Sequence, residues 1–200
     1  MNKVVRVPLN ATGEQAGRLQ ALQAAFAQAC NALAPLVQQT RCWNRVTLHH
    51  LAYKSLREQF PSLGSQMVCN VIYSVSRTSR QVFQHPRSPF HLTRLGSSPL
   101  PLLHFTDRCP VYFDRHTLSI KEGKLSMYTL DGRMRFDVTL GHDAEPAFRE
   151  QKLREIVLGR TREGGFELSF HFGGADTERA PDQATAVAEI PEYVKVQAAA

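Results

Sequence analysis

Apolar side chains in the first half of the chain recur at steps of three and four residues, which is the period of an amphipathic helix. A capping box at residues 12–15 and the apolar stripe that follows it predict a helix over residues 12–34. Similar patterns, separated by turn-forming residues, predict a second helix over 48–60 and a third over 65–83. A short alternating segment at residues 3–9 precedes these helices and predicts a strand.

The period changes to two after about residue 110, as is typical of strands with one buried and one exposed face. Glycine-containing pairs at residues 122–123, 131–132 and 164–165 indicate tight turns between these strands. The fold class that we predict is α+β, with a small antiparallel β-barrel and a three-helix insertion after the first strand. The expected barrel strands are residues 111–113, 117–120, 124–130, 133–140, 153–158 and 166–172.

The change of period also predicts the domain boundaries. Residues 1–10 and 104–172 are expected to form the β-barrel domain, and residues 11–84 the helical domain. Residues 85–103 are rich in proline, serine and arginine, which predicts a linker. Residues 173–200 combine a glycine pair, acidic residues and an alanine-rich end, so we expect an unpacked, flexible tail there.

The composition excludes several classes of protein. No apolar run is long enough to cross a bilayer and the N-terminus lacks a signal-like apolar segment, so we expect a cytoplasmic protein with no membrane partner. Cysteines occur singly, without a C-x-x-C pair, which predicts reduced thiols and neither a zinc ribbon nor a disulfide framework. We therefore predict no bound metal and no cofactor. The four cysteines are Cys30, Cys42, Cys69 and Cys109.

Positive charge is concentrated in the first half of the chain. Residues 1–95 hold eleven Lys and Arg against two Glu, a formal balance of +9. Residues 96–158 hold nine charges of each sign, and residues 159–200 hold four basic against seven acidic. A basic region of this kind suits a polyanion such as nucleic acid, because each phosphate that it neutralises releases a counterion.

Several segments resemble the N-terminal half of the TnpB (OrfB) transposon proteins, which are RNA-guided DNA nucleases related to the type V CRISPR effectors. The similarity lies in the order of a strand, a capped helical insertion and a barrel, over about residues 3–172. The segments that carry it are residues 28–31, 110–123, 129–134 and 163–171. The resemblance implies a wedge-like barrel, a helical recognition domain, and guide-type RNA and double-stranded DNA as partners.

The sequence departs from that family after the barrel. There the family continues into a RuvC-like nuclease domain and a zinc-binding insert with paired cysteines, and this chain has neither. Asp176 and Asp182 lie in a Gly/Ala/Thr-rich stretch, and the glutamate-bearing and second aspartate-bearing segments of such a nuclease do not follow it, so we expect no two-metal hydrolytic site in this chain alone. We predict a non-enzyme, with nuclease activity only where another chain supplies the RuvC-like domain.

The third predicted helix holds the expected DNA contacts. The resemblance implies that Gln66 and Asn70 read the bases of a short motif beside the target, and an amide suits an adenine edge. Arg77 and Arg80 recur on the same helical face and are expected to contact phosphate, and Tyr73, which precedes them on that face, is expected to be a stacking residue. The alternative is a solvated polar face without a ligand.

Further contacts are expected outside that helix. Arg41, Arg45 and Lys54 are candidates for the nucleic-acid backbone, and Trp43 for stacking on a base. A lone tryptophan in the hydrophobic core is the alternative for Trp43. Basic residues of the barrel are candidates for holding an RNA scaffold, although acidic residues lie among them. They are Arg115, Lys121, Lys124, Arg133 and Arg135.

Three hypotheses for the function follow. The first is a TnpB-like recognition module that binds guide-type RNA and target DNA and works with a RuvC-like nuclease subunit, or is a truncated element. The second is the N-terminal portion of a complete RNA-guided endonuclease whose RuvC domain lies on a continuing or partner chain. The third is a repressor that binds DNA without RNA.

Overall fold

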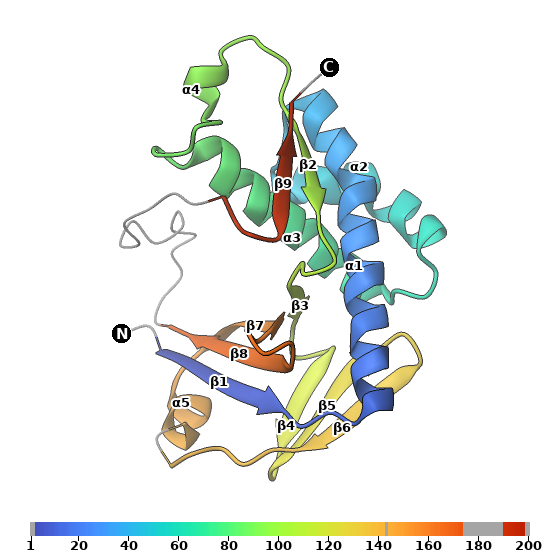
Figure 1. Cartoon of the computed structure of the whole chain (residues 1–200), viewed down its shortest axis with the longest axis vertical. Helices are drawn as coiled ribbons and strands as arrows, with labels where there is room; N and C mark the ends of the chain where they lie inside the picture. The colour runs from blue at the N-terminus through green and yellow to red at the C-terminus, as the bar shows by residue number, and fades with distance from the viewer. Residues whose placement is uncertain (1–2, 143, 174–189, 199–200) are drawn as a thin grey trace. The chain divides into compact units, whose positions relative to one another are not determined.

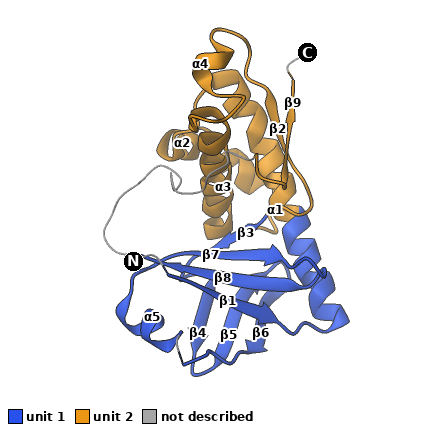
Figure 2. Cartoon of the chain, turned by 60° about the vertical axis from the view of Figure 1, so that its left-hand side comes forward, with its two compact units in different colours: residues 1–24, 110–176 blue, residues 25–109, 177–200 orange. Residues whose placement is uncertain are grey.

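The computed structural model describes residues 3–142, 144–173 and 190–198 of the 200-residue chain. It confirms an α+β fold of helices and antiparallel sheets. The chain divides into two compact units, drawn in different colours in Figure 2. The sheet unit comprises residues 1–24 and 110–176, and the helical unit comprises residues 25–109 and 177–200.

The sheet unit contains two antiparallel sheets. Its elements are β1 (Lys3–Leu9), the start of α1 (Gly13–Thr40), β3 (Val111–Phe113), β4 (Leu118–Lys121), β5 (Lys124–Thr129), β6 (Gly132–Asp137), α5 (Glu145–Glu150), β7 (Leu153–Arg160) and β8 (Phe166–Phe172). The strand order is β1-β8-β7-β3 in one sheet and β4-β5-β6 in the other. The β1–β8 ladder runs from Lys3 opposite Phe172 to Leu9 opposite Phe166.

Closure of these strands into a barrel is not found among the described residues, where they pair as two separate sheets. The alternation itself is confirmed, because Phe166, Leu168, Phe170 and Phe172 of β8 are buried and the residues between them are half-exposed. Alternation determines which face of a strand is buried, but it does not determine which edge strands pair. The closed barrel therefore stays a prediction.

The helical unit contains most of α1 and the remaining elements (Figure 1). They are α2 (Arg45–Gln59), α3 (Ser65–Gln84), α4 (Leu92–Leu95), β2 (Leu102–Phe105) and β9 (Val194–Gln197). The helix α3 is the most enclosed of them. Its buried residues include Met67, Val71 and Val75, together with a set of small polar side chains.

The capping box at the start of α1 is confirmed. The Thr12 N–H donates to Gln15 Oε1 (2.9 Å), and the Gln15 N–H donates to Thr12 Oγ1 (3.2 Å). The helix extends to Thr40, six residues beyond the expected end, and passes through Pro35. Proline inside a helix removes one backbone hydrogen bond. Val37 lies one turn after Leu33 on the same apolar stripe, and both are buried. This packing offsets the lost hydrogen bond, since tertiary packing supplies most of the stability of a helix.

Polar side chains of α1 hold it in the sheet unit. Arg18 Nη2 donates to Thr129 Oγ1 (2.8 Å) and to the Asp131 carbonyl (3.2 Å). The Gln23 side chain is buried, and its Oε1 accepts from Arg160 Nε (2.9 Å). These contacts give Arg18 a structural role, so it does not add to the set of arginines available to a ligand.

Within the helical unit, Asn31 of α1 pairs with the backbone of β2. Asn31 Nδ2 donates to the Phe105 carbonyl (2.9 Å), and the Phe105 N–H donates to Asn31 Oδ1 (2.7 Å). One amide side chain therefore satisfies both backbone groups of Phe105 in the way a neighbouring strand does. The side chain of Gln38, two turns later, donates to the Leu100 carbonyl (3.0 Å).

We expect Asn31→Ala to lower the free energy of unfolding by about 2–6 kcal/mol, because it leaves two backbone groups without partners at roughly 1–3 kcal/mol each. The measurement is urea unfolding followed by circular dichroism. Gln28→Ala is the matched control, since Gln28 is exposed three residues earlier on the same helix and should change stability by less than about 0.5 kcal/mol. Equal losses in the two variants would contradict this role for Asn31.

The segments predicted as linker and tail contain regular structure. Residues 85–103 include α4 and the start of β2, and residues 173–200 include β9. In the β2–β9 ladder Leu103 lies opposite Val196 and Phe105 opposite Val194. The Thr106 N–H also donates to the Tyr193 carbonyl (2.9 Å). An unpacked tail is therefore wrong for Val194–Gln197, where a β-branched alternation pairs with an available strand edge.

Candidate nucleic-acid interface

A narrow stripe of α3 reaches solvent. Apart from Ser65 and Gln81, the other positions of the helix are buried, and the stripe follows steps of three and four residues along one side. The stripe consists of Gln66, Cys69, Tyr73, Arg77, Arg80 and Gln84. The structure thus brings Gln66, Tyr73, Arg77 and Arg80 to one surface, as the sequence predicts, while their roles stay predictions.

Asn70 does not belong to this stripe. Its side chain is only 7% exposed, and its Nδ2 lies 3.8 Å from Met67 Sδ. The prediction that Asn70 reads a base is therefore wrong for this conformation. Helical spacing places it near Gln66, but spacing alone does not tell how much of the helix is covered by neighbouring elements. Cys69 takes the accessible position instead, which its place between Gln66 and Tyr73 could have indicated.

Two arginines contact the ring of Tyr73. The Arg45 guanidinium carbon lies 5.3 Å from the ring centroid, a cation–π distance. Arg77 Nη1 lies 3.2 Å from the phenol oxygen and donates to it. Together with Arg80, these residues form what we call the α2–α3 cluster: Arg45, Tyr73, Arg77 and Arg80. The aromatic ring holds the two guanidinium groups in place without neutralising their charge.

Lys54 is exposed on α2 but does not join this cluster. It follows Arg45 by nine residues, which is two and a half helical turns, so the two side chains leave opposite sides of the helix. A contact of Lys54 with the nucleic-acid backbone stays a prediction. If it occurs, it involves a different part of the surface of α2 from the α2–α3 cluster.

Trp43 is part of the hydrophobic core. It is 7% exposed, and its ring centroid lies 5.4 Å from that of Phe83 at an interplanar angle of 36°. The Trp43 carbonyl accepts from Ser76 Oγ (2.6 Å). A base cannot stack on a ring that is enclosed in this way, so the stacking prediction for Trp43 is wrong and the core alternative is right.

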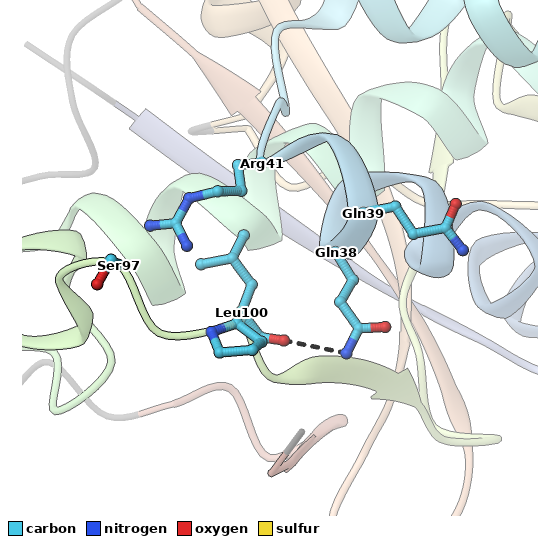
Figure 3. Close-up of a pocket in the computed structure, with 6 residues that line it drawn as sticks. Gln38, Gln39, Arg41, Ser97 and Leu100 are labelled. Carbon is cyan, nitrogen blue, oxygen red and sulfur yellow. Dashed lines mark hydrogen bonds between the residues drawn. The ribbon is translucent and has the colours of Figure 1, made fainter. Parts of the chain in front are cut away.

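Arg41 holds the loop that follows α4. Its Nη1 donates to the Ser98 carbonyl (2.7 Å) and its Nη2 to the Gly96 carbonyl (2.9 Å). Figure 3 shows Arg41 at the edge of a hollow of about 380 Å³, with Gln38 bonded to Leu100 nearby. Both terminal nitrogens of Arg41 donate to backbone carbonyls, so its guanidinium is not available for a two-point contact with phosphate. The predicted contact of Arg41 with the nucleic-acid backbone is therefore wrong for this conformation.

Arg57 and Arg94 act in the same way as Arg41. Arg57 Nη1 donates to the Leu63 carbonyl (2.7 Å), and Arg94 Nη1 donates to the Ser88 carbonyl (3.0 Å). A share of the positive charge in residues 1–95 therefore stabilises loops. These side chains still raise the positive potential of the surface, but their guanidinium geometry is fixed by the protein itself.

The candidate RNA-binding residues gather on one face of the β4-β5-β6 sheet. Lys121 lies opposite Lys124, and Arg135 lies opposite Ser126, at positions that alternate with the buried residues. Arg133 is more constrained, because Nε and Nη2 donate to the side chain and backbone of Ser126 (2.8 and 3.1 Å).

Fewer basic residues contribute to that face than the sequence predicts. Asp137 lies opposite Lys124 and offsets part of its charge. Arg115 is exposed in the turn before β4 and lies outside the strands. The face therefore presents a small basic surface made by Lys121, Lys124 and Arg135, and RNA binding by it stays a prediction.

Other chemistry is limited in the part of the chain that the structure describes. No group of three or more His, Cys, Asp or Glu side chains there could hold a metal ion, and no helix there has the length and apolar character to span a bilayer. Burial raises the pKa of the Cys30 thiol well above its ordinary value, and contact with Cys109 raises it further. Asp176 and Asp182 lie outside the described residues.

The sequence matches no protein-family model and no curated protein. The resemblance to the TnpB proteins therefore rests on the residues quoted above, and what it implies about function is a proposal.

Proposed function

We propose that the protein binds nucleic acid through the α2–α3 cluster, as a TnpB-like recognition module for guide-type RNA and target DNA. The observation that carries this proposal is the accessible stripe of α3, where Arg77 and Arg80 follow Tyr73 at steps of four and three residues and Arg45 lies over the Tyr73 ring. No acidic residue occurs anywhere in α3. A helix face that carries arginines attracts phosphate, and α3 itself contributes no carboxylate to that face.

Four residues of the stripe have a task in this proposal. Arg77 and Arg80 bind phosphates and fix the position of the strand, while Tyr73 offers a partly exposed ring to a base or sugar. Gln66, in the first turn of α3, is the residue that reads a base edge. The basic face of Lys121, Lys124 and Arg135 is the second contact, for the RNA scaffold.

Nuclease activity is not part of the proposal for this chain alone. Cleavage requires a RuvC-like domain from another chain or from a longer form of this one. Binding of duplex DNA with no measurable affinity for RNA would favour the repressor hypothesis instead, so both nucleic acids belong in the same experiment.

The test is fluorescence anisotropy with labelled duplex DNA and labelled RNA. We expect the double variant Arg77→Ala/Arg80→Ala to bind about 10- to 100-fold more weakly, because it removes two phosphate contacts with a net contribution of roughly 0.7–1.4 kcal/mol each. Arg149→Ala is the control, since Arg149 is exposed on α5 and its loss also lowers the net charge. An equal loss per charge in Arg149→Ala would mean that binding follows net charge and not the α2–α3 cluster.

A further inference from the structure

A hollow of about 480 Å³ opens between the start of α2 and the middle of α3. Sites for small molecules have volumes of about 300–1,000 Å³, so the hollow is large enough for a ligand of that class. No residue of its lining is acidic. The side chains that decide its chemistry are Asn44, Arg45, Val46, His49, Cys69 and Arg80.

Two guanidinium groups make one part of the wall cationic. Arg45 is oriented by the Tyr73 ring, with its guanidinium carbon 5.3 Å from the centroid. Arg80 reaches the hollow from the accessible stripe of α3. A planar guanidinium matches the oxygens of phosphate in a two-point contact, so two of them beside one hollow favour a phosphate-bearing ligand.

The remaining wall suits a flat ring. Val46 lines the hollow, is 64% exposed and provides an apolar surface, while the His49 ring stacks on Tyr53 with centroids 4.6 Å apart and planes 20° apart. Asn44 Oδ1 caps α2 by accepting from the Thr47 N–H (3.1 Å). The Asn44 amine is therefore the group that can donate to a ligand, and base edges carry acceptors for it.

We propose that this hollow binds a single nucleotide, with its phosphate between Arg45 and Arg80 and its base against Val46 and His49. The ligand chemistry is a nucleoside phosphate, which is supplied either as a free mononucleotide or as one nucleotide turned out of a bound single strand. The second source rests on the proposed function, and the first does not.

Cys69 provides a probe inside the hollow, and Cys42 provides an internal control. Both are half-exposed, but only Cys69 lines the hollow, while Cys30 and Cys109 are fully buried. Alkylation by iodoacetamide is followed at each cysteine by peptide mass spectrometry. We expect uridine or adenosine 5′-monophosphate, at ten times its dissociation constant, to slow alkylation of Cys69 about tenfold and to leave Cys42 unchanged.

Two variants separate the hollow from the surrounding surface. Arg80→Ala removes a lining residue and should abolish the protection of Cys69 by the mononucleotide. Arg77→Ala removes a neighbouring charge that does not line the hollow, so protection by the mononucleotide should remain. Both variants change side chains on the accessible stripe, and circular dichroism tests whether they are folded.

Protection of Cys69 by other ligands decides the ligand class and its source. Inorganic phosphate that protects Cys69 as well as the mononucleotide would overturn the base contact. Protection by a single-stranded oligonucleotide but not by an abasic strand of equal length assigns the nucleotide to a bound strand, whereas equal protection by both overturns the proposal. A Cys69 that does not react even without ligand overturns it too, because the hollow is then closed.

Anisotropy on the same samples keeps the two proposals distinct. Labelled nucleic acid that binds while no ligand protects Cys69 would overturn the nucleotide site and leave the proposed function standing. Protection by a mononucleotide without any binding of RNA or DNA would overturn the proposed function and support the nucleotide site.

Discussion

Trp43→Ala should lower the free energy of unfolding by about 3–5 kcal/mol, the usual cost of removing a large aromatic side chain from a core. The indole is 7% exposed and packs against Phe83, so its loss leaves a cavity that the neighbouring helices cannot fill. Urea unfolding followed by circular dichroism at 222 nm measures the effect, because the variant no longer has the chain's single tryptophan as a fluorophore.

Two further variants make this result specific. Trp43→Phe keeps an apolar ring and should recover a large part of the stability. Leu51→Ala removes an apolar side chain from an exposed position of α2 and should change stability by less than about 0.5 kcal/mol. Trp43→Ala protein with unchanged stability and selectively weakened nucleic-acid binding would instead support the stacking role that the fold argues against.

The helices could be predicted from the sequence wherever a local signal marks them. The capping box locates the start of α1, and the third helix begins at Ser65 and ends one residue beyond the prediction. The helix α2 begins at Arg45, three residues earlier than expected. Its signal is Asn44, an N-cap whose side chain accepts from the Thr47 N–H, and it stands in a stretch without apolar periodicity.

The strands were predictable from their alternation, but the sheets were not. Positions 124–129 and 132–137 alternate between exposed and buried side chains as expected, so the basic face of the β4-β5-β6 sheet could be listed in advance. Pairing between distant segments leaves no such mark on the sequence. The ladder of β2 with β9 joins residues about ninety positions apart, and neither segment indicates its partner.

The candidate site could be predicted only in part, because charge and spacing do not reveal what a side chain already contacts. Arg41 and Arg77 look alike in the sequence, yet Arg41 is bonded to two loop carbonyls and Arg77 to a tyrosine hydroxyl on the accessible stripe. Asn70 and Cys69 differ in the same way, since the neighbouring elements cover one and not the other. The difference depends on tertiary packing, which a single sequence does not encode in a local pattern.

Binding of nucleic acid should depend steeply on salt. If six phosphates are engaged, the affinity should fall about 10³-fold between roughly 50 and 200 mM monovalent salt, because each neutralised phosphate releases about 0.9 counterion. Arg45, Arg77 and Arg80 supply three of these contacts in the α2–α3 cluster, and the other contacts come from basic residues elsewhere on the surface. The measurement is anisotropy of labelled duplex DNA over a salt series.

The slope of that dependence tests the cluster more sharply than the affinity does. Arg77→Ala/Arg80→Ala should lower the slope by about two units, so that the same change of salt weakens binding only about 10²-fold. Arg149→Ala should leave the slope unchanged, because an exposed charge on α5 outside the interface releases no counterion on binding.

Gln66→Ala should also leave the slope unchanged, since an amide is neutral. It should relax the preference for one base by about 1–3 kcal/mol, measured by competition against a randomised duplex library. A slope that is equal in all the variants would exclude Arg77 and Arg80 from the phosphate contacts, and a lower slope in Gln66→Ala would mean that the start of α3 touches the backbone and not a base.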